Sequence, residues 1–210
     1  ENDLSKLEQV KKLALKKHPG ADVEIISTSE SVKTFVKELV DKKKIDYVVL
    51  GLETKTKISK FIYGTTGVDL ASKIDCPVII VPESYKVHKL KHALITVDNK
   101  HNIKKRSVEK VKKFAKRYEC SQEIIHIKTE DEFLMIYERN PKKDNEKWNV
   151  KTIEAKSFGD GINKYTKIKN TDLIVLFSHS HSAFYNFFNE TNTKLIAFQS
   201  KTPVMSIHEK

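Results

Sequence analysis

The sequence predicts an α/β protein built on a doubly wound, parallel five-stranded sheet, present as one partial copy followed by one complete copy. Two observations predict this. Runs of apolar residues typical of buried strands alternate with amphipathic helical patterns, and a pattern in the first half recurs in the second half. Parallel neighbouring strands need a crossover connection, which a helix between them supplies.

The repeat aligns the two halves without a gap. Asp46 and the apolar run after it match Asp172 and its apolar run, and residues 76–83 match residues 202–209. The offset is 126 residues at both ends of the match (172 − 46 and 209 − 83). A constant offset over this length indicates two copies of one structural unit.

The first copy begins in the middle of this unit. Helical spacing places Leu4, Leu7, Val10 and Ala14 on the buried face of a first helix, followed by a strand at Val23–Ile26. After the capping candidates Ser29 and Ser31, a second helix has an apolar face of Val32, Phe35, Val36, Leu39 and Val40. A strand at Tyr47–Leu50, a helix around residues 62–74 and a strand at Val78–Val81 complete this copy.

The second copy has five strands and four helices. We expect its strands at Ala93–Val97, Ile124–Ile127, Val150–Ala155, Leu173–Leu176 and Val204–Ile207, and helices that include residues 108–118 and 130–137. The first copy lacks the initial strand, helix and strand of this order. The predicted domains are therefore residues 1–83, the C-terminal part of the first copy, a linker at residues 84–89, and the complete copy at residues 90–210.

Composition excludes several classes of protein. No apolar run approaches the length of a membrane span. Cys76 and Cys120 are too few for a disulfide framework, which indicates a reducing, cytoplasmic setting. The formal net charge is +11, but its lysines and arginines mostly fall on polar helix faces, so we expect solvated surface rather than a nucleic-acid footprint.

Chemistry-bearing residues give no catalytic arrangement and no metal site. His179 and His181 provide only two ligands, and we interpret their surroundings as a polar loop. The aromatic residues 184–188 are interpreted as core or interface packing. No nucleophile elbow or triad can be placed.

The glycines after the strand at Tyr47–Leu50 carry a resemblance. Gly51, Thr54, Gly64 and Thr65 fit the spacing G-x2-G-x9-G-[ST] at three of its four positions, and Cys76-Pro77 opens an apolar run. In these features the chain resembles the universal stress protein family, which has an adenine nucleotide alpha hydrolase-like fold. The resemblance implies ATP or AMP bound by Gly51, Gly64, Thr65 and Thr66, since glycines let backbone N–H groups approach phosphate oxygens.

The second copy departs from this pattern. Phe177, Ser180, Glu190 and Thr191 stand at the corresponding positions, and the Glu190 carboxylate would repel phosphate. We therefore expect no nucleotide in the second copy, although Asp98 matches the family's acidic residue that faces base and ribose. In the first copy Thr54 departs from the pattern, and its side chain could block a close approach to the backbone. Gly64 is also open to a reading as a turn before a helix capped by Thr65 or Thr66.

The resemblance also implies the strand order 3-2-1-4-5, which would leave strands of the first copy without neighbours. The chain starts at Glu1, without an initiator Met. Two accounts are open: either a segment equivalent to about residues 90–126 precedes this chain, which we favour, or another chain supplies the pairing. The two copies are expected to form a pseudo-dimer through their last strands, and a homodimer is open.

The expected function is a universal stress response protein that binds an adenine nucleotide as a regulator, without strong catalytic activity, although weak ATP hydrolysis stays open. Two alternatives remain. One is a nucleotide-free scaffold or interaction protein of the same fold, motivated by Thr54 and Glu190. The other is a basic nucleic-acid-binding protein, motivated by the net charge of +11.

Overall fold

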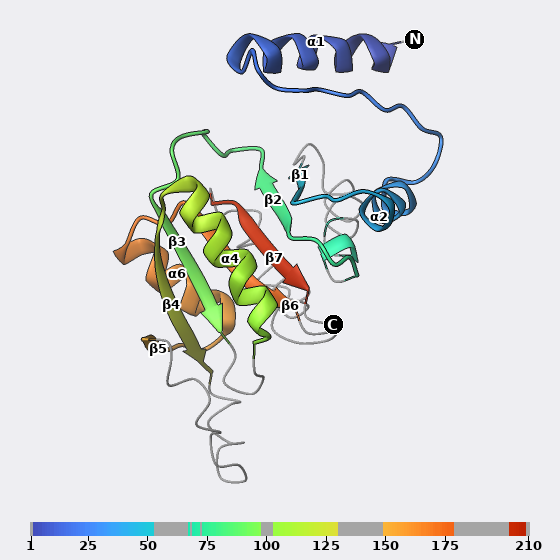
Figure 1. Cartoon of the computed structure of the whole chain (residues 1–210). Helices are drawn as coiled ribbons and strands as arrows, with labels where there is room; N and C mark the ends of the chain where they lie inside the picture. The colour runs from blue at the N-terminus through green and yellow to red at the C-terminus, as the bar shows by residue number, and fades with distance from the viewer. Residues whose placement is uncertain are drawn as a thin grey trace. The chain divides into compact units, whose positions relative to one another are not determined.

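The computed structural model describes residues 2–52, 67, 69–71, 73–97, 103–129, 149–178 and 202–208. It divides into two compact units, residues 1–36 and residues 37–210. The described elements, labelled in Figure 1, are α1 (Asn2–Lys17), α2 (Val32–Lys42), β1 (Val48–Leu52), β2 (Val78–Pro82), β3 (His92–Val97), α4 (Lys105–Tyr118), β4 (Ser121–Lys128), β5 (Val150–Glu154), α6 (Phe158–Ile168), β6 (Leu173–Ser178) and β7 (Val204–His208).

The first unit contains α1 and an extended segment. Within this unit Leu4, Leu7 and Val10 are exposed, so the unit by itself does not bury the predicted apolar face of the helix. No strand forms at Val23–Ile26, which also contradicts the prediction. A strand is defined by hydrogen bonds to a neighbour, and no described residue pairs with this segment.

Helix α2 begins as the sequence predicts. The Ser31 Oγ accepts a hydrogen bond from the Thr34 backbone N–H at 3.2 Å, so Ser31, rather than Ser29, caps the helix. Phe35, Val36 and Leu39 are half-buried, whereas Val32 is exposed. The apolar face is therefore only partly covered.

A seven-stranded sheet organises the second unit, in the order β1-β2-β7-β6-β3-β4-β5. All neighbours are parallel except β2 and β7, which pair antiparallel. When the five strands of the second half, β3 to β7, are numbered 1 to 5 along the chain, their order in the sheet from β5 to β7 is 3-2-1-4-5. This order confirms the expected doubly wound sheet. The predicted helix at residues 130–137 lies outside the described residues.

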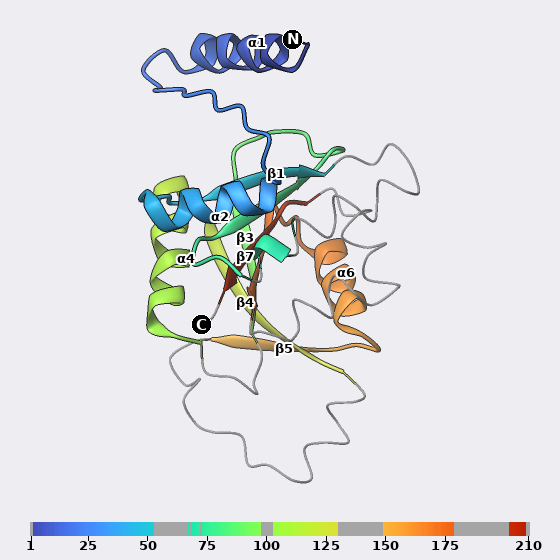
Figure 2. The same cartoon turned by 90° about the vertical axis from the view of Figure 1, so that its right-hand side faces the viewer.

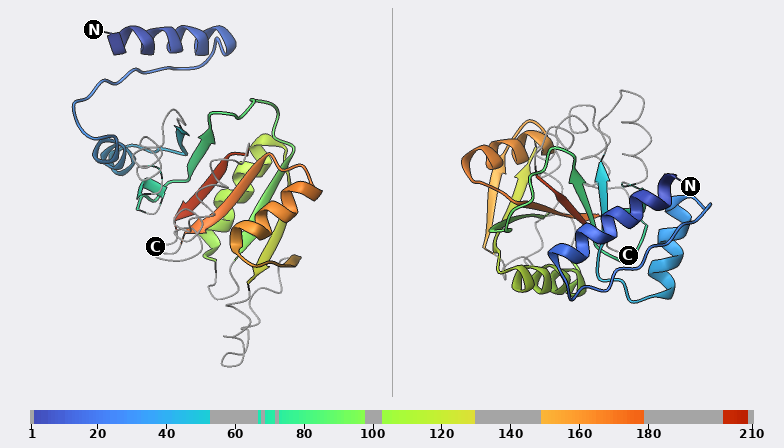
Figure 3. Two further views of the ribbon diagram at one scale, coloured as in Figure 1. Left: turned by 180° about the vertical axis from the view of Figure 1, so that it is seen from behind. Right: turned by 90° about the horizontal axis from the view of Figure 1, so that it is seen from above.

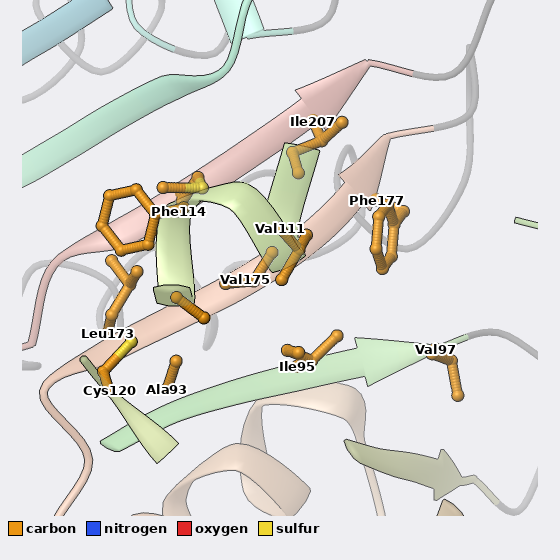
Figure 4. Close-up of a cluster of buried hydrophobic side chains, with 12 residues drawn as sticks. Ala93, Ile95, Val97, Val111, Phe114, Cys120, Leu173, Val175, Phe177 and Ile207 are labelled. Carbon is orange, nitrogen blue, oxygen red and sulfur yellow. The ribbon is translucent and has the colours of Figure 1, made fainter. Parts of the chain in front are cut away.

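Helices α4 and α6 cover opposite faces of this sheet (Figures 2 and 3). Alternate strand residues point to opposite faces, so one strand serves two cores. On the α4 face, Val111 and Phe114 pack against strands β3, β6 and β7 (Figure 4). That cluster consists of Ala93, Ile95, Val97, Val111, Phe114, Ala115, Cys120, Leu173, Val175, Phe177, Met205 and Ile207.

On the α6 face, a glycine sets the distance between helix and sheet. A Cβ placed on Gly161 would lie 2.5 Å from Ile127 Cγ2 and 2.9 Å from Ile127 Cδ1. The Ser157 side chain caps the helix by accepting a hydrogen bond from the Asp160 N–H. The helix backbone therefore rests directly on β4, with no room for a side chain at position 161.

We predict that Gly161→Ala lowers the free energy of unfolding by about 1 to 3 kcal/mol, because the added methyl forces α6 or Ile127 to move. Urea denaturation followed by circular dichroism measures this change. Gly20→Ala is the control, since a Cβ there meets no atom within 4 Å and the substitution should be nearly neutral. Equal stability of Gly161→Ala and the wild type would contradict the close approach.

Candidate functional site

The carboxyl ends of the strands are the expected place for a ligand. In open α/β sheets, ligands bind outside these ends where neighbouring strands send their connections to opposite sides. In the second half this point lies between β3 and β6, because β3 leads through α4 to β4 on one side while β6 leads to β7 on the other. In the first half, β1 and β2 are parallel and end at a common edge.

Of the five predicted nucleotide contacts, Gly51 is the one that lies within the described residues. It lies opposite Val81 in the β1–β2 pairing, near the carboxyl end of β1, and it is exposed. Strand β1 ends at Leu52, whereas the sequence predicted its end at Leu50. Gly51 therefore lies within the strand and does not begin the loop after it. A Cβ at this position would meet no atom of the described residues within 4 Å.

Gly64, Thr65, Thr66 and Asp98, the other predicted nucleotide contacts, lie outside the described residues. The same holds for the departures from the pattern at Thr54, Glu190 and Thr191, and for His179 and His181. Within the described ranges, no group of three or more His, Cys, Asp or Glu residues could hold a metal ion.

His126 is a buried polar residue beside the switch point that the sequence reasoning missed. Its Nδ1 donates a hydrogen bond to the Val97 carbonyl at 3.1 Å, which fixes the last residue of β3. Val97 directly precedes Asp98. A lone histidine inside the apolar strand 124–127 was the signal that could have drawn attention to it.

At the amino ends of the strands, Asp172 holds the start of β3 against the start of β6. One carboxylate oxygen accepts the backbone N–H groups of Lys91 and His92 at 2.7 and 2.9 Å, and the other lies 2.8 Å from the His88 Nε2. Burial acts to raise the pKa of Asp172, but these hydrogen bonds outweigh it and the pKa is lowered. The linker before β3 is thereby attached to β6.

His88 makes hydrogen bonds with both ring nitrogens. Its Nδ1 lies 2.6 Å from the Lys86 carbonyl and its Nε2 lies beside the Asp172 carboxylate. Both acceptors lack protons, so the doubly protonated imidazolium satisfies both contacts. The hydrogen bond to Asp172, together with the one to Lys86, raises the pKa of His88.

Glu123 lies at the centre of a second polar network, also near the amino ends of the strands. Its carboxylate, with a side chain only 14% exposed, binds the amino groups of Lys151, at 2.7 Å, and Lys169. Hydrogen bonds from these two lysines, and one from Tyr165, lower the pKa of Glu123 to about 2. At neutral pH the carboxylate therefore joins β4, β5 and the end of α6 as an anion.

Tyr165 continues this network into the core. Its hydroxyl lies 3.0 Å from the His92 Nε2, and the His92 Nδ1 lies 3.0 Å from the Ser121 Oγ. Burial, followed by the charge of Lys169, lowers the pKa of His92, and burial together with Glu123 raises that of Tyr165. Both groups are therefore neutral near pH 7, as a buried structural network requires.

Neither cysteine is poised for nucleophilic chemistry. Both are buried, and the Cys76 Sγ donates to the Ile45 carbonyl at 3.5 Å. Burial raises the pKa of the Cys76 thiol to about 11 and also raises that of Cys120. A thiol with a raised pKa carries little of the reactive thiolate at neutral pH.

We predict that Glu123→Gln lowers the free energy of unfolding by about 2 kcal/mol at pH 7, because the hydrogen bonds to charged groups are lost. The folded-state pKa lies below the ordinary value of 4.5, so this stabilisation is present above that value and disappears as the pH falls toward 2. Urea unfolding of both proteins across this range measures the difference.

Glu119→Gln is the matched control, because Glu119 forms a highly exposed ion pair with Lys89. That change should alter stability much less than Glu123→Gln. A pH-independent difference between Glu123→Gln and the wild type would contradict the assignment of a strongly lowered pKa.

The comparisons with known proteins agree with the described fold. Residues 1–82 match the sequence model of the Universal stress protein family. Among curated protein sequences, none matches this chain significantly. None of the helices in the described part of the chain has the length and apolar character that crossing a bilayer requires.

Solved structures resemble the chain over nearly its whole length. A universal stress protein from Archaeoglobus fulgidus DSM 4304 is 19% identical, with a TM-score of 0.61 over 96% of this chain and 75% of that one. A protein of unknown function from Pseudomonas aeruginosa PAO1 is 10% identical, with a TM-score of 0.62 over 96% and 77%. The cytoplasmic domain of a prokaryotic cation chloride cotransporter is also similar, with 10% identity and a TM-score of 0.51 over 96% and 78%.

At these identities the structural matches establish the fold, and the sequence match covers the half that contains Gly51 and Gly64. Residues 1–82 therefore match the Universal stress protein family, and the described sheet shares the fold of the similar solved structures.

Proposed function

We propose that this protein is a stress-response regulator that holds an adenine nucleotide, ATP or AMP, in its first half without strong catalytic activity. The observation that carries the proposal is Gly51, which lies exposed near the carboxyl end of β1, where a Cβ would meet no atom of the described residues within 4 Å. A phosphate or ribose needs such an approach to the main chain. The phosphate contacts proposed to follow are Gly64, Thr65 and Thr66.

The proposed site belongs to the half that matches the family. Residues 1–82 include Gly51 and Gly64, whereas the second half carries Glu190 where the first carries Gly64. We propose that the second half binds no nucleotide, and that Asp98 is a remnant of an adenosine contact.

The proposed arrangement is a pseudo-dimer of the two halves. Support comes from β2 and β7, the last strands of the two halves, which pair antiparallel. Tyr47 from the first half also packs edge-on against Phe114 of α4, with ring centroids 5.5 Å apart. A cytoplasmic setting is proposed from the two buried free cysteines.

Isothermal titration calorimetry of the full chain with ATP tests the nucleotide proposal. We expect saturable binding to the wild type, and Gly64→Glu, which copies the residue at position 190, should weaken it by about tenfold or more through charge repulsion. Gly20→Ala is the control and should bind as the wild type does.

Circular dichroism of Gly64→Glu separates a lost site from a lost fold. Absence of binding heat for the wild type at millimolar ATP would contradict the proposal and favour the nucleotide-free scaffold. Equal affinities of the wild type and Gly64→Glu would place the nucleotide elsewhere.

A further inference from the structure

The linker between the two halves, residues 84–89, has little support from the core. A turn begins it, closed by a hydrogen bond from the Tyr85 N–H to the Pro82 carbonyl at 3.0 Å, and residues 85–89 have no regular secondary structure. Residues 86–89 are all exposed, and Val87 is 90% exposed. A segment without buried apolar side chains opens locally at little cost in free energy. Polar contacts therefore decide whether residues 86–89 stay in place.

Side chains of His88 and Lys89 connect the linker to the second half. The His88 Nε2 lies 2.8 Å from a carboxylate oxygen of Asp172, just before β6, and the Lys89 amino group lies 3.0 Å from the Glu119 carboxylate, just after α4. Both side chains of the Lys89–Glu119 pair are mostly exposed, and such a pair contributes little to stability. The Asp172 side chain is only 14% exposed, and two backbone N–H groups at the start of β3 fix its position. His88 therefore makes the better anchored of these two contacts.

The hydrogen bonds of His88 fix the number of protons on its ring. The Nδ1 lies 2.6 Å from the Lys86 carbonyl, and the Nε2 faces the Asp172 carboxylate. A carbonyl and an ionised carboxylate accept hydrogen bonds but cannot donate them. A neutral imidazole has one N–H, so its other ring nitrogen would present a lone pair to an acceptor, and that contact would be repulsive. Only the protonated ring makes both contacts.

Tyr85 and Lys91 are also near this ring. The Tyr85 and His88 rings lie 5.4 Å apart between centroids, and Lys91 acts on His88 through its charge. The hydrogen bond to Asp172, followed by that to the Lys86 carbonyl, raises the pKa of His88, whereas burial and the Lys91 charge act in the opposite direction. The two acceptors therefore outweigh the lysine, and the raised pKa agrees with the geometry.

We propose that His88 is a pH-sensitive clasp: its protonated ring holds the linker against the start of β6, and loss of one proton releases residues 86–89. Because the pKa is raised above the ordinary value of 6.5, the clasp is complete below that value and is lost as the pH rises through the raised value. The linker follows β2, so release frees the connection between the two halves while the β2–β7 pairing still joins them. The clasp does not depend on nucleotide binding.

A change at Asp172 should reverse the pH dependence. In Asp172→Asn, the amide oxygen can still accept the N–H groups of Lys91 and His92. The amide NH₂ then faces the His88 Nε2. A neutral ring with its hydrogen on Nδ1 accepts from this NH₂ and still donates to the Lys86 carbonyl. The protonated ring does not fit, because two donors would face each other. This variant should therefore hold the linker at high pH and release it at low pH.

The test is limited proteolysis of the full chain with trypsin, which cleaves an open linker after Lys86 and Lys89. Mass spectrometry measures the rate of this cleavage from about pH 5.5 to about pH 8.5. Each rate is divided by the rate for His88→Gln at the same pH, which cancels the pH dependence of trypsin itself. Glutamine keeps a polar side chain at position 88 but does not titrate. His18→Gln, in the separate compact unit of residues 1–36, is the matched control.

We expect the wild-type ratio to be lowest at the acidic end and to rise by about fivefold or more toward the alkaline end, because one proton controls the contact. Asp172→Asn should show the opposite slope, and His18→Gln should follow the wild type. Nitrogen-15 NMR of the His88 ring should give a titration midpoint above 6.5 in the wild type and a lower midpoint in Asp172→Asn.

Three outcomes would overturn the proposal: a wild-type ratio that stays constant or falls as the pH rises, an Asp172→Asn slope equal to that of the wild type, or a His88 midpoint at or below the ordinary value. A constant ratio in Asp172→Asn would still support the clasp, since its anionic partner is gone. Circular dichroism shows whether each variant is folded. If Asp172→Asn does not fold, the wild-type ratio and the ring titration decide, because neither uses that variant.

Discussion

The seven-stranded sheet depends on the antiparallel pairing of β2 with β7. This pairing joins β1 and β2 to the five parallel strands of the second half, through Val78 opposite Ser206 and Ile80 opposite Val204. All four residues are buried, so the contact removes apolar surface and main-chain groups from water together. Helix α4 strengthens it from one face, where Phe114 packs against Tyr47 and Lys113 pairs with Asp46.

The amino ends and the carboxyl ends of the strands differ in their polar groups. At the amino ends of the strands, Asp172 and Glu123 are held by several donors each, which stabilises the junctions of β3 with β6 and of β4 with β5. Near the carboxyl end of β1, a Cβ at Gly51 would meet no atom of the described residues within 4 Å. The described carboxylates that accept several hydrogen bonds each thus lie at the amino ends of the strands, whereas ligands of open α/β sheets bind outside the carboxyl ends.

The two aspartates that precede equivalent strands show how one sequence motif acquires two roles. Asp172 is largely buried because β3 lies beside it and supplies two backbone donors. Asp46 has the same place in the repeat but contacts a lysine of α4 and is mostly exposed. The difference arises from the neighbouring strand and not from the aspartate itself.

The sequence by itself determined the alternation of strands and helices, the offset of 126 residues and two capping candidates for α2, because these depend on local spacing. The structure then showed that Ser31 is the cap. The sequence predicted Gly51 as a site residue, but not that Gly51 lies within β1.

Only the tertiary structure decided which predicted segments acquire partners. Residues 23–26 have the apolar pattern of a strand, yet no described strand pairs with them. The contacts of Asp172, Glu123 and His126 were likewise invisible in the sequence, since each joins residues about 30 or more positions apart. Local pattern fixes what a segment can form, whereas burial and pairing depend on which distant residues the fold brings beside it.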